Sequence, residues 1–138
     1  MTDDAYALRP IGRVESPLTR REEAPRQGDE GAPDAWLVID PAAAAGLHGV
    51  AAGTDLLVLT WLDRADRDVL TVHPRGDRDR PRTGVFATRS PDRPNPIGLH
   101  HVRITAIDGL RLRVQNLEAI DGTPVLDLKP ILGPPAER

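Results

Sequence analysis

Apolar and polar residues alternate along several short stretches of this chain, which is the pattern of β-strands with one buried face. The clearest pair is 97–107 and 110–117, because these two runs flank Asp108-Gly109, which fits a two-residue type I′ hairpin turn. Residues 54–62 form a continuous apolar run, typical of a central, buried strand. Further strands are predicted at 8–16, 35–39, 69–73 and 125–130.

One short helix is predicted between these strands. Asp40 suits its N-cap, Pro41 suits its first position, and alanines continue it until Gly46 or Gly49. Fourteen prolines and twelve glycines indicate many turns, which suit short strands better than long helices. The chain is therefore predicted to be mainly β, a small closed or nearly closed β-barrel of about eight strands with one short helix.

The length of 138 residues allows one domain, which we expect to span 1–138 with loose tails at 1–7 and 132–138. The apolar content of 39% and the charged content of 28% fit a soluble globular protein. Aromatic residues make up only 3% of the chain, so the core must be built from aliphatic side chains.

Several classes of protein are disfavoured. The chain has no cysteine, which excludes disulfides and thiolate metal sites, and its histidines lack the spacing of metal ligands, so no metal is expected. His100 and His101 are neighbours on a predicted strand and must point to opposite faces. No apolar run is long enough to span a membrane and the start lacks signal-peptide features, so we expect no membrane partner and a cytoplasmic protein.

The stretch from Gly84 to Leu99 combines stiffness with polar side chains. It begins like a strand at Val85-Phe86 and then becomes a loop in which three prolines restrict the backbone: Pro91, Pro94 and Pro96. Between the prolines lie planar, multidentate polar groups: Arg89, Arg93 and Asn95. A stiff loop loses little entropy when it binds a ligand, so this pattern favours a ligand site. The alternative is a proline-rich turn whose arginines lie in solvent.

Charge is unevenly distributed along the chain. The net charge is −3, but residues 64–93 hold eight arginines and five aspartates, which leaves −6 on the rest. A basic stripe on an acidic body is consistent with a nucleic acid or phosphate partner that touches one face. The equally weighted alternative is a solvated loop in which alternating arginines and aspartates largely cancel.

A second motif, Asp-Gly-Thr-Pro-Val-Leu-Asp-Leu-Lys-Pro, covers residues 121–130. Asp127 and Lys129 are two residues apart on a predicted strand, so both point to one face, which Val125 is expected to share. The other face would carry Leu126 and Leu128. Such a pair fixes a polar ligand or forms only a surface ion pair.

These two motifs, Arg-Ser-Pro followed by Arg-Pro-Asn-Pro-Ile-Gly and Asp-Gly-Thr-Pro-Val followed by Asp-x-Lys-Pro, resemble the signatures of the TsaA-like, or TrmO, family. The resemblance covers roughly residues 10–130 and implies a β-barrel methyltransferase that uses S-adenosylmethionine. The best-known acceptor in the family is a threonylcarbamoyl-adenosine beside the tRNA anticodon, which is methylated at N6. Longer members continue beyond the point where this chain stops, so we expect a minimal domain. Ile131 stands where the family often has an aromatic residue.

The resemblance also implies which residues form the site, and it implies a homodimer because the family's sites lie at a dimer interface. The expected donor-binding residues are Arg26, Gln27, Arg89, Arg93, Asn95, Pro96, Ile97 and Leu126. The expected catalytic residues are Asp127, as proton acceptor, and Lys129 in the same pocket. From the basic stripe we expect Arg78, Arg80 and Arg82 to contact tRNA.

Two alternatives stay open at this point. One is a methyltransferase of the same chemistry that acts on a small molecule or on another modified nucleoside. The other is a non-catalytic module that binds S-adenosylmethionine or a nucleotide through the Arg-Pro-Asn-Pro loop. Turnover of the donor separates an enzyme from a binding module, and the identity of the methylated product separates the two enzymes.

Overall fold

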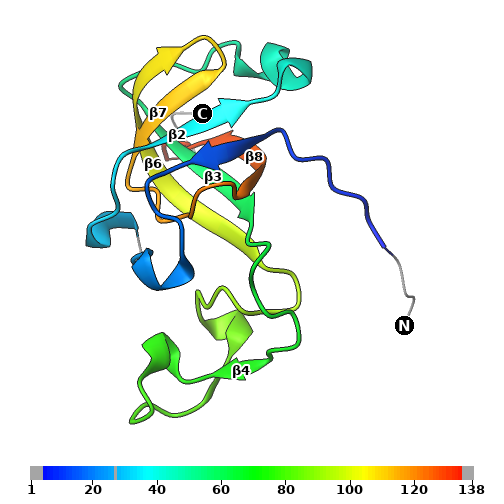
Figure 1. Cartoon of the computed structure of the whole chain (residues 1–138), viewed down its shortest axis with the longest axis vertical. Coiled ribbons are helices and arrows are strands. Elements are labelled where there is room, and N and C mark those ends of the chain that lie inside the picture. Colours follow the sequence, from blue (N-terminus) through cyan, green and yellow to red (C-terminus); the bar gives the residue numbers. More distant parts are fainter. Residues whose placement is uncertain (1–4, 27, 135–138) are drawn as a thin grey trace.

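Six antiparallel strands close into a barrel (Figure 1). The structure is a computed structural model that describes residues 5–26 and 28–134. Around the ring the order is β1-β2-β7-β6-β3-β8, and β8 pairs with β1 to complete it. The strands are β1 (Gly12–Glu15), β2 (Ala35–Ile39), β3 (Asp55–Trp61), β6 (Ile97–Asp108), β7 (Arg111–Gln115) and β8 (Pro124–Pro130). The predicted small β-barrel is therefore confirmed.

The barrel interior is aliphatic, as the shortage of aromatic residues requires. Alternate residues of the strands point inward, and Val14, Leu37, Val58, Val102 and Val114 are fully buried there. Burying one such side chain stabilises the fold by roughly 1.5–3 kcal/mol. The core thus holds the barrel as a rigid body from which the connecting loops project.

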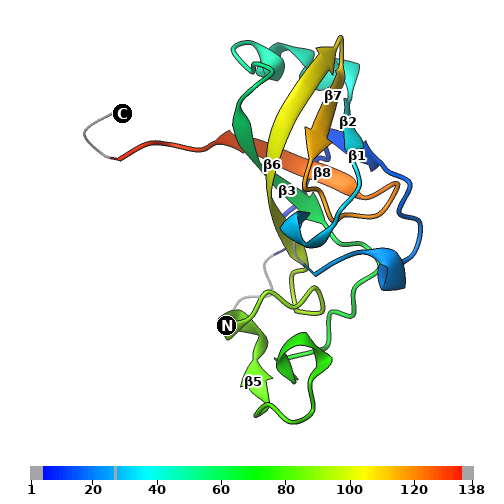
Figure 2. The same cartoon turned by 90° about the vertical axis from the view of Figure 1, so that its left-hand side faces the viewer.

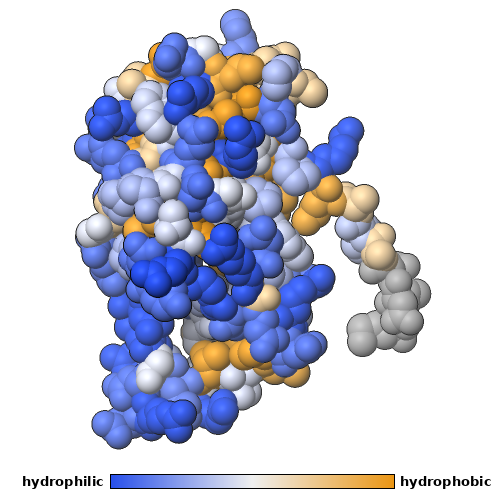
Figure 3. Space-filling model, viewed as in Figure 1, coloured by the Kyte–Doolittle hydropathy of each residue, from blue (hydrophilic) through white to orange (hydrophobic). Residues whose placement is uncertain are grey.

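The long connection between β3 and β6, residues 62–96, forms a separate lobe beyond one end of the barrel (Figures 1 and 2). It contains the two-stranded sheet of β4 (Thr71–Val72) and β5 (Thr83–Gly84) and the 3-10 helices η4 (Pro74–Gly76) and η5 (Val85–Ala87). Figure 3 shows apolar surface on this lobe. Its exposed apolar side chains include Leu70 and Phe86.

The connection between β1 and β2 reaches toward the lobe (Figure 1). It carries the 3-10 helices η1 (Arg21–Glu23) and η2 (Gly28–Glu30). An ion pair of 2.9 Å joins Arg21 to Asp92, and one of 2.7 Å joins Glu30 to Arg75, so both helices are tied to the lobe. The lobe is thereby held against the barrel at two separate points.

The predicted helix is present as the 3-10 helix η3 (Pro41–Leu47), although the side chain of its N-cap residue Asp40 makes no capping hydrogen bond. The other 3-10 turns of the described residues, η1, η2, η4 and η5, were not predicted. Across the described part of the chain, no helix has both the length and the apolar character that a bilayer span requires.

Two predicted strand segments differ from the structure. The segment 69–73 contains only the two residues of β4, and Val85-Phe86 lies in η5 instead of a strand. The reason lies at the Val85 carbonyl, which accepts the N–H of Thr88 at 3.0 Å and the guanidinium of Arg93 at 2.7 Å. These bonds draw the chain into a tight turn immediately after β5.

The hairpin between β6 and β7 is confirmed, but its turn is not of type I′. Asp108 pairs with Arg111, so the central residues are Gly109 and Leu110. Only Gly109 has a positive φ, of 58°, whereas type I′ requires positive φ at both positions. The register shift between Ile104 and Ala106 moves the pairing by one residue and so displaces the turn.

A second irregularity changes which residues of β8 share a face. Asp127 pairs with Leu59 and Val125 pairs with Thr60, so Leu126 is an extra residue in a β-bulge. Val125 is fully buried and Leu128 packs against the core, whereas Asp127 and Lys129 are exposed. The prediction that Val125 shares a face with Asp127 and Lys129 is therefore wrong.

Candidate functional site

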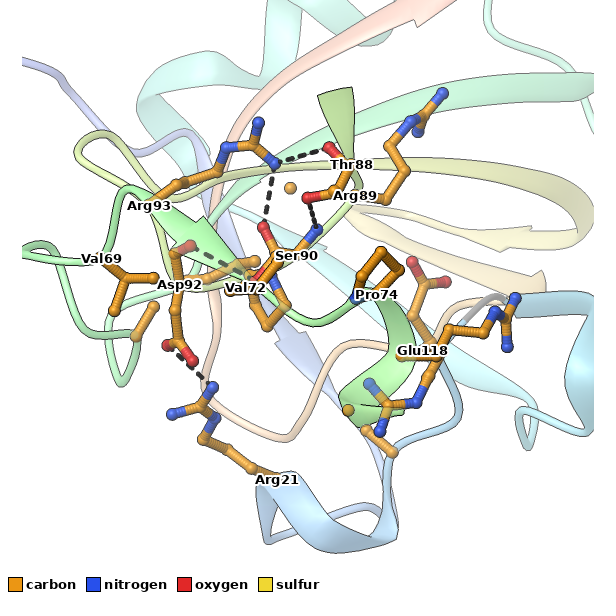
Figure 4. A pocket seen from close by; sticks show the side chains of 18 of the residues that line it. Arg21, Val69, Val72, Pro74, Thr88, Arg89, Ser90, Asp92, Arg93 and Glu118 are labelled. Carbon is orange, nitrogen blue, oxygen red and sulfur yellow. Dashed lines mark hydrogen bonds and ion pairs between the residues drawn. The ribbon is translucent and has the colours of Figure 1, made fainter. Parts of the chain in front are cut away.

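A cleft of about 1700 Å³ lies where the lobe and the β1–β2 connection meet the end of the barrel. Its walls come from the β1–β2 connection, the lobe, the start of β6 and the β7–β8 connection. Figure 4 shows this cleft with side chains from all these segments directed into it. We refer to it as the cleft.

Residues 88–97 form one wall of the cleft, and we call them the signature loop. Arg93 holds this loop in shape, because its guanidinium donates to three backbone carbonyls, those of Val85 at 2.7 Å, Ser90 at 2.9 Å and Thr88 at 3.2 Å (Figure 4). The Ser90 N–H also donates to the Thr88 hydroxyl at 3.1 Å. These bonds add to the restriction that the prolines impose, so the loop is rigid before any ligand arrives.

The other polar residues of the signature loop face the cleft. Arg89 is exposed and lines it. Asn95 accepts a hydrogen bond of 3.2 Å on Oδ1 from Arg67, whose Nε also donates to the Pro94 carbonyl at 2.7 Å. Arg67 lies over the ring of Trp61 at 5.2 Å. Since the amide oxygen of Asn95 is engaged, a ligand would meet its NH₂ group as a donor.

Arginines form the wall opposite the barrel. The predicted tRNA-binding residues Arg78, Arg80 and Arg82 are exposed and line the cleft from the lobe, together with Arg26 from the β1–β2 connection. Arg82 donates to the hydroxyl of Thr71 at 3.2 Å, which anchors it to β4. The basic stripe of the sequence therefore lies beside the signature loop.

The structure brings together only part of the predicted site. Within one chain the cleft is lined by Arg26, Arg89, Arg93, Asn95 and Ile97. Other predicted residues lie elsewhere: Pro96 is buried behind the signature loop, and Leu126, Asp127 and Lys129 lie on β8 outside the cleft. Gln27 lies outside the described residues.

Asp127 and Lys129 occupy the outer face of the barrel, where their charged groups are 3.7 Å apart. The register places Leu59 between Asp127 on β8 and Leu99 on β6, and Leu99 is one of the cleft residues. The predicted catalytic pair therefore shares an outer surface with the cleft's edge, although it does not line the cleft in a single chain.

One group in the cleft was not predicted from the sequence. His100 is 3% exposed, and its Nδ1 lies 2.6 Å from Oε1 of Glu118 while its Nε2 lies 2.7 Å from the hydroxyl oxygen of Thr60. As predicted, His100 and His101 point to opposite faces, since His101 is exposed and bonds to Asp55 at 2.9 Å. The available signal was a histidine at an inward position of an alternating strand, which requires buried polar partners.

Comparison with known proteins decides the family. A family model described as the tRNA-methyltransferase O N-terminal domain matches residues 13–133. The chain belongs to this family. Its recognition from the two motifs is thereby confirmed, and the expected class of enzyme, a methyltransferase that uses S-adenosyl-L-methionine, is the class of this family.

Relatives with similar sequences carry names that describe donor binding. The chain is 45% identical over 122 residues to an S-adenosyl-L-methionine-binding protein of Archaeoglobus fulgidus, with 88% of this chain and 86% of that protein covered. It is 42% identical over 130 residues to a probable S-adenosyl-L-methionine-binding protein of Methanothermobacter thermautotrophicus, with 94% and 93% covered.

Solved structures agree with these relatives. A crystal structure of TrmO superimposes with a TM-score of 0.75 at 30% identity, covering 96% of this chain and 57% of that one. TrmO from Pseudomonas aeruginosa gives a TM-score of 0.73 at 29% identity, covering 94% of this chain and 57% of that one. The chain thus spans little more than half of the solved TrmO chains it matches, and 33% of a second, longer Archaeoglobus fulgidus relative.

Proposed function

We propose that this protein transfers a methyl group from S-adenosyl-L-methionine to N6 of a threonylcarbamoyl-adenosine beside the anticodon of tRNA. The observation that carries the proposal is the rigid signature loop, which Arg93 fixes on the wall of a cleft that also bears the basic stripe. One loop would hold the donor while the opposite wall holds the nucleic acid. A tRNA substrate makes the cytoplasm the expected location.

The residues of the cleft fit the chemistry of the donor. An adenosine needs apolar contacts on its faces, and Val69, Val72 and Phe86 line the cleft with Ile97. The donor's carboxylate needs a guanidinium, which Arg26 and Arg89 offer as exposed groups of the cleft. Methyl transfer is an in-line displacement, so a site that only aligns sulfonium and nucleophile already supplies much of the catalysis.

The acceptor would lie along the arginine wall. Arg78, Arg80 and Arg82 would follow the phosphates of an anticodon stem-loop while the target base is turned outward into the cleft. Single-stranded loops are the usual target of such recognition, because their bases are free to unstack.

We propose further that two copies of the chain form the working unit. The outer face of β8, β3 and β6 carries apolar residues where solvent would favour polar ones: Leu57, Leu59, Trp61, Ile97 and Leu99, all half-buried or exposed. Asp127 and Lys129 border this face. A second copy packed there would enclose the predicted catalytic pair next to the edge of the cleft.

The test begins with donor binding. Calorimetry on metal-stripped protein should show saturable binding of S-adenosyl-L-methionine or its demethylated product, and Asn95→Ala should abolish it. Mass spectrometry of nucleosides should then show N6 methylation of tRNA that carries threonylcarbamoyl-adenosine. Folded protein that binds no donor at millimolar concentration would contradict the whole proposal, whereas binding without tRNA methylation would contradict only the acceptor and favour a small-molecule substrate.

A further inference from the structure

Glu118 lies at a fixed position on the floor of the cleft. Its neighbours in sequence, Leu117, Ala119 and Ile120, are buried in or beside the barrel core, so the backbone on both sides is anchored. The side chain of Glu118 is 16% exposed, lines the cleft, and in Figure 4 points its carboxylate into the space between the lobe and the barrel. It is therefore a carboxylate that a bound ligand can reach.

A buried relay holds this carboxylate from behind. His100 contacts Oε1 of Glu118 through Nδ1 and contacts Thr60 through Nε2, and both His100 and Thr60 are inaccessible to solvent. With Glu118 ionised, Nδ1–H donates to the carboxylate and the neutral ring accepts the Thr60 hydroxyl at Nε2. This arrangement fixes one carboxylate oxygen, Oε1, and leaves Oε2 for the cleft.

Thr60 is not itself a reactive group, because Gly98 covers it. A Cβ atom placed on Gly98 would overlap the Thr60 hydroxyl and lie 2.7 Å from Nε2 of His100. The relay is thus closed at its inner end and opens to the cleft only through Glu118. Its geometry suits the positioning of one carboxylate.

Other carboxylates of the cleft have different partners. Asp92 is paired with Arg21 at 2.9 Å and Glu30 with Arg75 at 2.7 Å. A carboxylate that is bonded to a guanidinium is a poor proton acceptor, since protonation would sacrifice the ion pair. Glu118 has a histidine as its printed partner, and it lies closer to the core than these exposed or half-exposed pairs.

We propose that Glu118 binds the reacting N–H of the methyl acceptor and takes its proton, with His100 as the positioning residue. The inference rests on the proposed methyltransferase function. The acceptor nitrogen uses its lone pair to bond the methyl carbon, and the carbon–sulfur bond breaks with its electrons passing to sulfur. The proton of that nitrogen passes to Oε2 of Glu118 and then to water, so charge and atoms balance.

This assignment replaces Asp127 as the proton acceptor. Asp127 is exposed on the outer face of β8, is ion-paired with Lys129, and reaches a cleft only if a second copy is present. Glu118 is in the cleft of the single chain. Two carboxylates therefore compete for the role, and they are separable by substitution.

The experiment compares Glu118→Gln, Asp127→Asn and Glu15→Gln with the parent protein. Glutamine at 118 keeps an oxygen that accepts from Nδ1–H of His100 but cannot take a proton. Glu15→Gln is the matched control, since it makes the same chemical change on β1, where Glu15 is ion-paired with Arg111 away from the cleft. Each variant is measured for thermal unfolding, donor affinity by calorimetry, and single-turnover methylation of tRNA bearing threonylcarbamoyl-adenosine.

We expect Glu118→Gln to retain the unfolding temperature and to bind the donor within about twofold, while methylation slows by roughly a hundredfold or more, the usual effect of a lost general base. Glu15→Gln should match the parent in all three measurements. Parent-like methylation by Glu118→Gln, or a larger loss in Asp127→Asn, would overturn the role of Glu118 and leave the proposed function standing. A parent that binds no donor or methylates no tRNA removes the proposed function, and the role of Glu118 with it.

Discussion

Gly98 is a residue whose side chain, a single hydrogen, is required by its neighbours. The Cβ of an alanine there would overlap the Thr60 hydroxyl and approach Nε2 of His100 to 2.7 Å, so the buried hydrogen bond between them would break. Overpacking and an unsatisfied buried polar group together cost roughly 2–4 kcal/mol. We predict that Gly98→Ala lowers the melting temperature by roughly 10 °C in calorimetry.

The control for this prediction is Gly46→Ala in η3. No atom lies within 4 Å of a Cβ built on Gly46, and the residue is exposed. Its melting temperature should stay close to that of the parent. A Gly98→Ala protein as stable as the Gly46→Ala protein would show that the space around Thr60 and His100 adapts more easily than the structure indicates.

The sequence could identify the polar residues of the signature loop but could not distinguish their roles. Arg89 and Arg93 look equivalent in the motif, yet Arg93 spends its donors on three carbonyls of its own loop and Arg89 is exposed in the cleft. The difference depends on the path of the backbone, which places carbonyls around one guanidinium only. Glu118 gave no signal because its partner His100 lies on another strand.

At the scale of strands, alternation predicted where strands lie but not where their register slips. The strand 35–39 ends as predicted because all five residues follow one unbroken alternation. On β8 and β6 an extra residue, Leu126 on one and Thr105 on the other, shifts every following side chain to the opposite face. Such bulges are selected by closure of the barrel, a property of the whole sheet that a local pattern does not contain.

The pairing of β3 with β6 also predicts a dependence of stability on pH. Asp55 accepts hydrogen bonds from His101 at 2.9 Å and Arg103 at 3.0 Å, and these contacts, that of His101 first, lower the pKa of the Asp55 carboxyl from its ordinary value. A carboxyl whose pKa is lower in the folded state stabilises the protein above its unfolded pKa, near 4, and loses that contribution as the pH falls.

We therefore predict that Asp55→Asn is less stable than the parent at pH 6 and that the difference shrinks steadily between pH 4 and pH 2. Urea unfolding at a series of pH values measures it, with salt expected to reduce the difference because the pair is exposed. A difference that is constant across this range would mean that the asparagine acts by packing and not by charge.

At the scale of the whole molecule, the barrel could be predicted and the cleft could not. Strands and turns follow from local patterns, so their number and type limit the fold to a few architectures. The cleft is made by polar loops that meet through long-range ion pairs such as Arg21–Asp92 and Arg75–Glu30. Neither partner of these pairs stands out among the many charged residues of the sequence.

The proposed dimer gives the next prediction. Leu99 is 43% exposed on the apolar outer face of β6, so Leu99→Asp should leave the barrel folded but place a charge in the proposed interface. Light scattering at tens of micromolar, with donor present, should give a dimer for the parent and a monomer for Leu99→Asp. Ile107→Asp is the control, because Ile107 is similarly exposed, at 39%, near the hairpin end of β6. A parent that is monomeric under these conditions contradicts the dimer directly.

The basic stripe gives the last prediction, which concerns the acceptor. Arg78, Arg80 and Arg82 are exposed on the lobe wall of the cleft and lie outside the two signature motifs. Each phosphate contact that an arginine makes adds a counterion-release contribution to affinity, which weakens as salt rises. Replacing all three by glutamine should therefore weaken tRNA binding and methylation at low salt and flatten their salt dependence by up to about three contacts, while donor affinity stays unchanged.

A second triple variant, in which Arg103, Arg111 and Arg113 become glutamine, provides the matched control. It removes the same charge from the barrel surface outside the cleft, where these arginines pair with Asp55, Glu15 and Asp34. If charge acts only through the net field of the protein, both variants should lose methylation equally. If the lobe arginines contact phosphate, only the first variant should lose the salt dependence, and a first variant that methylates tRNA like the parent at every salt concentration would show that the stripe is solvated.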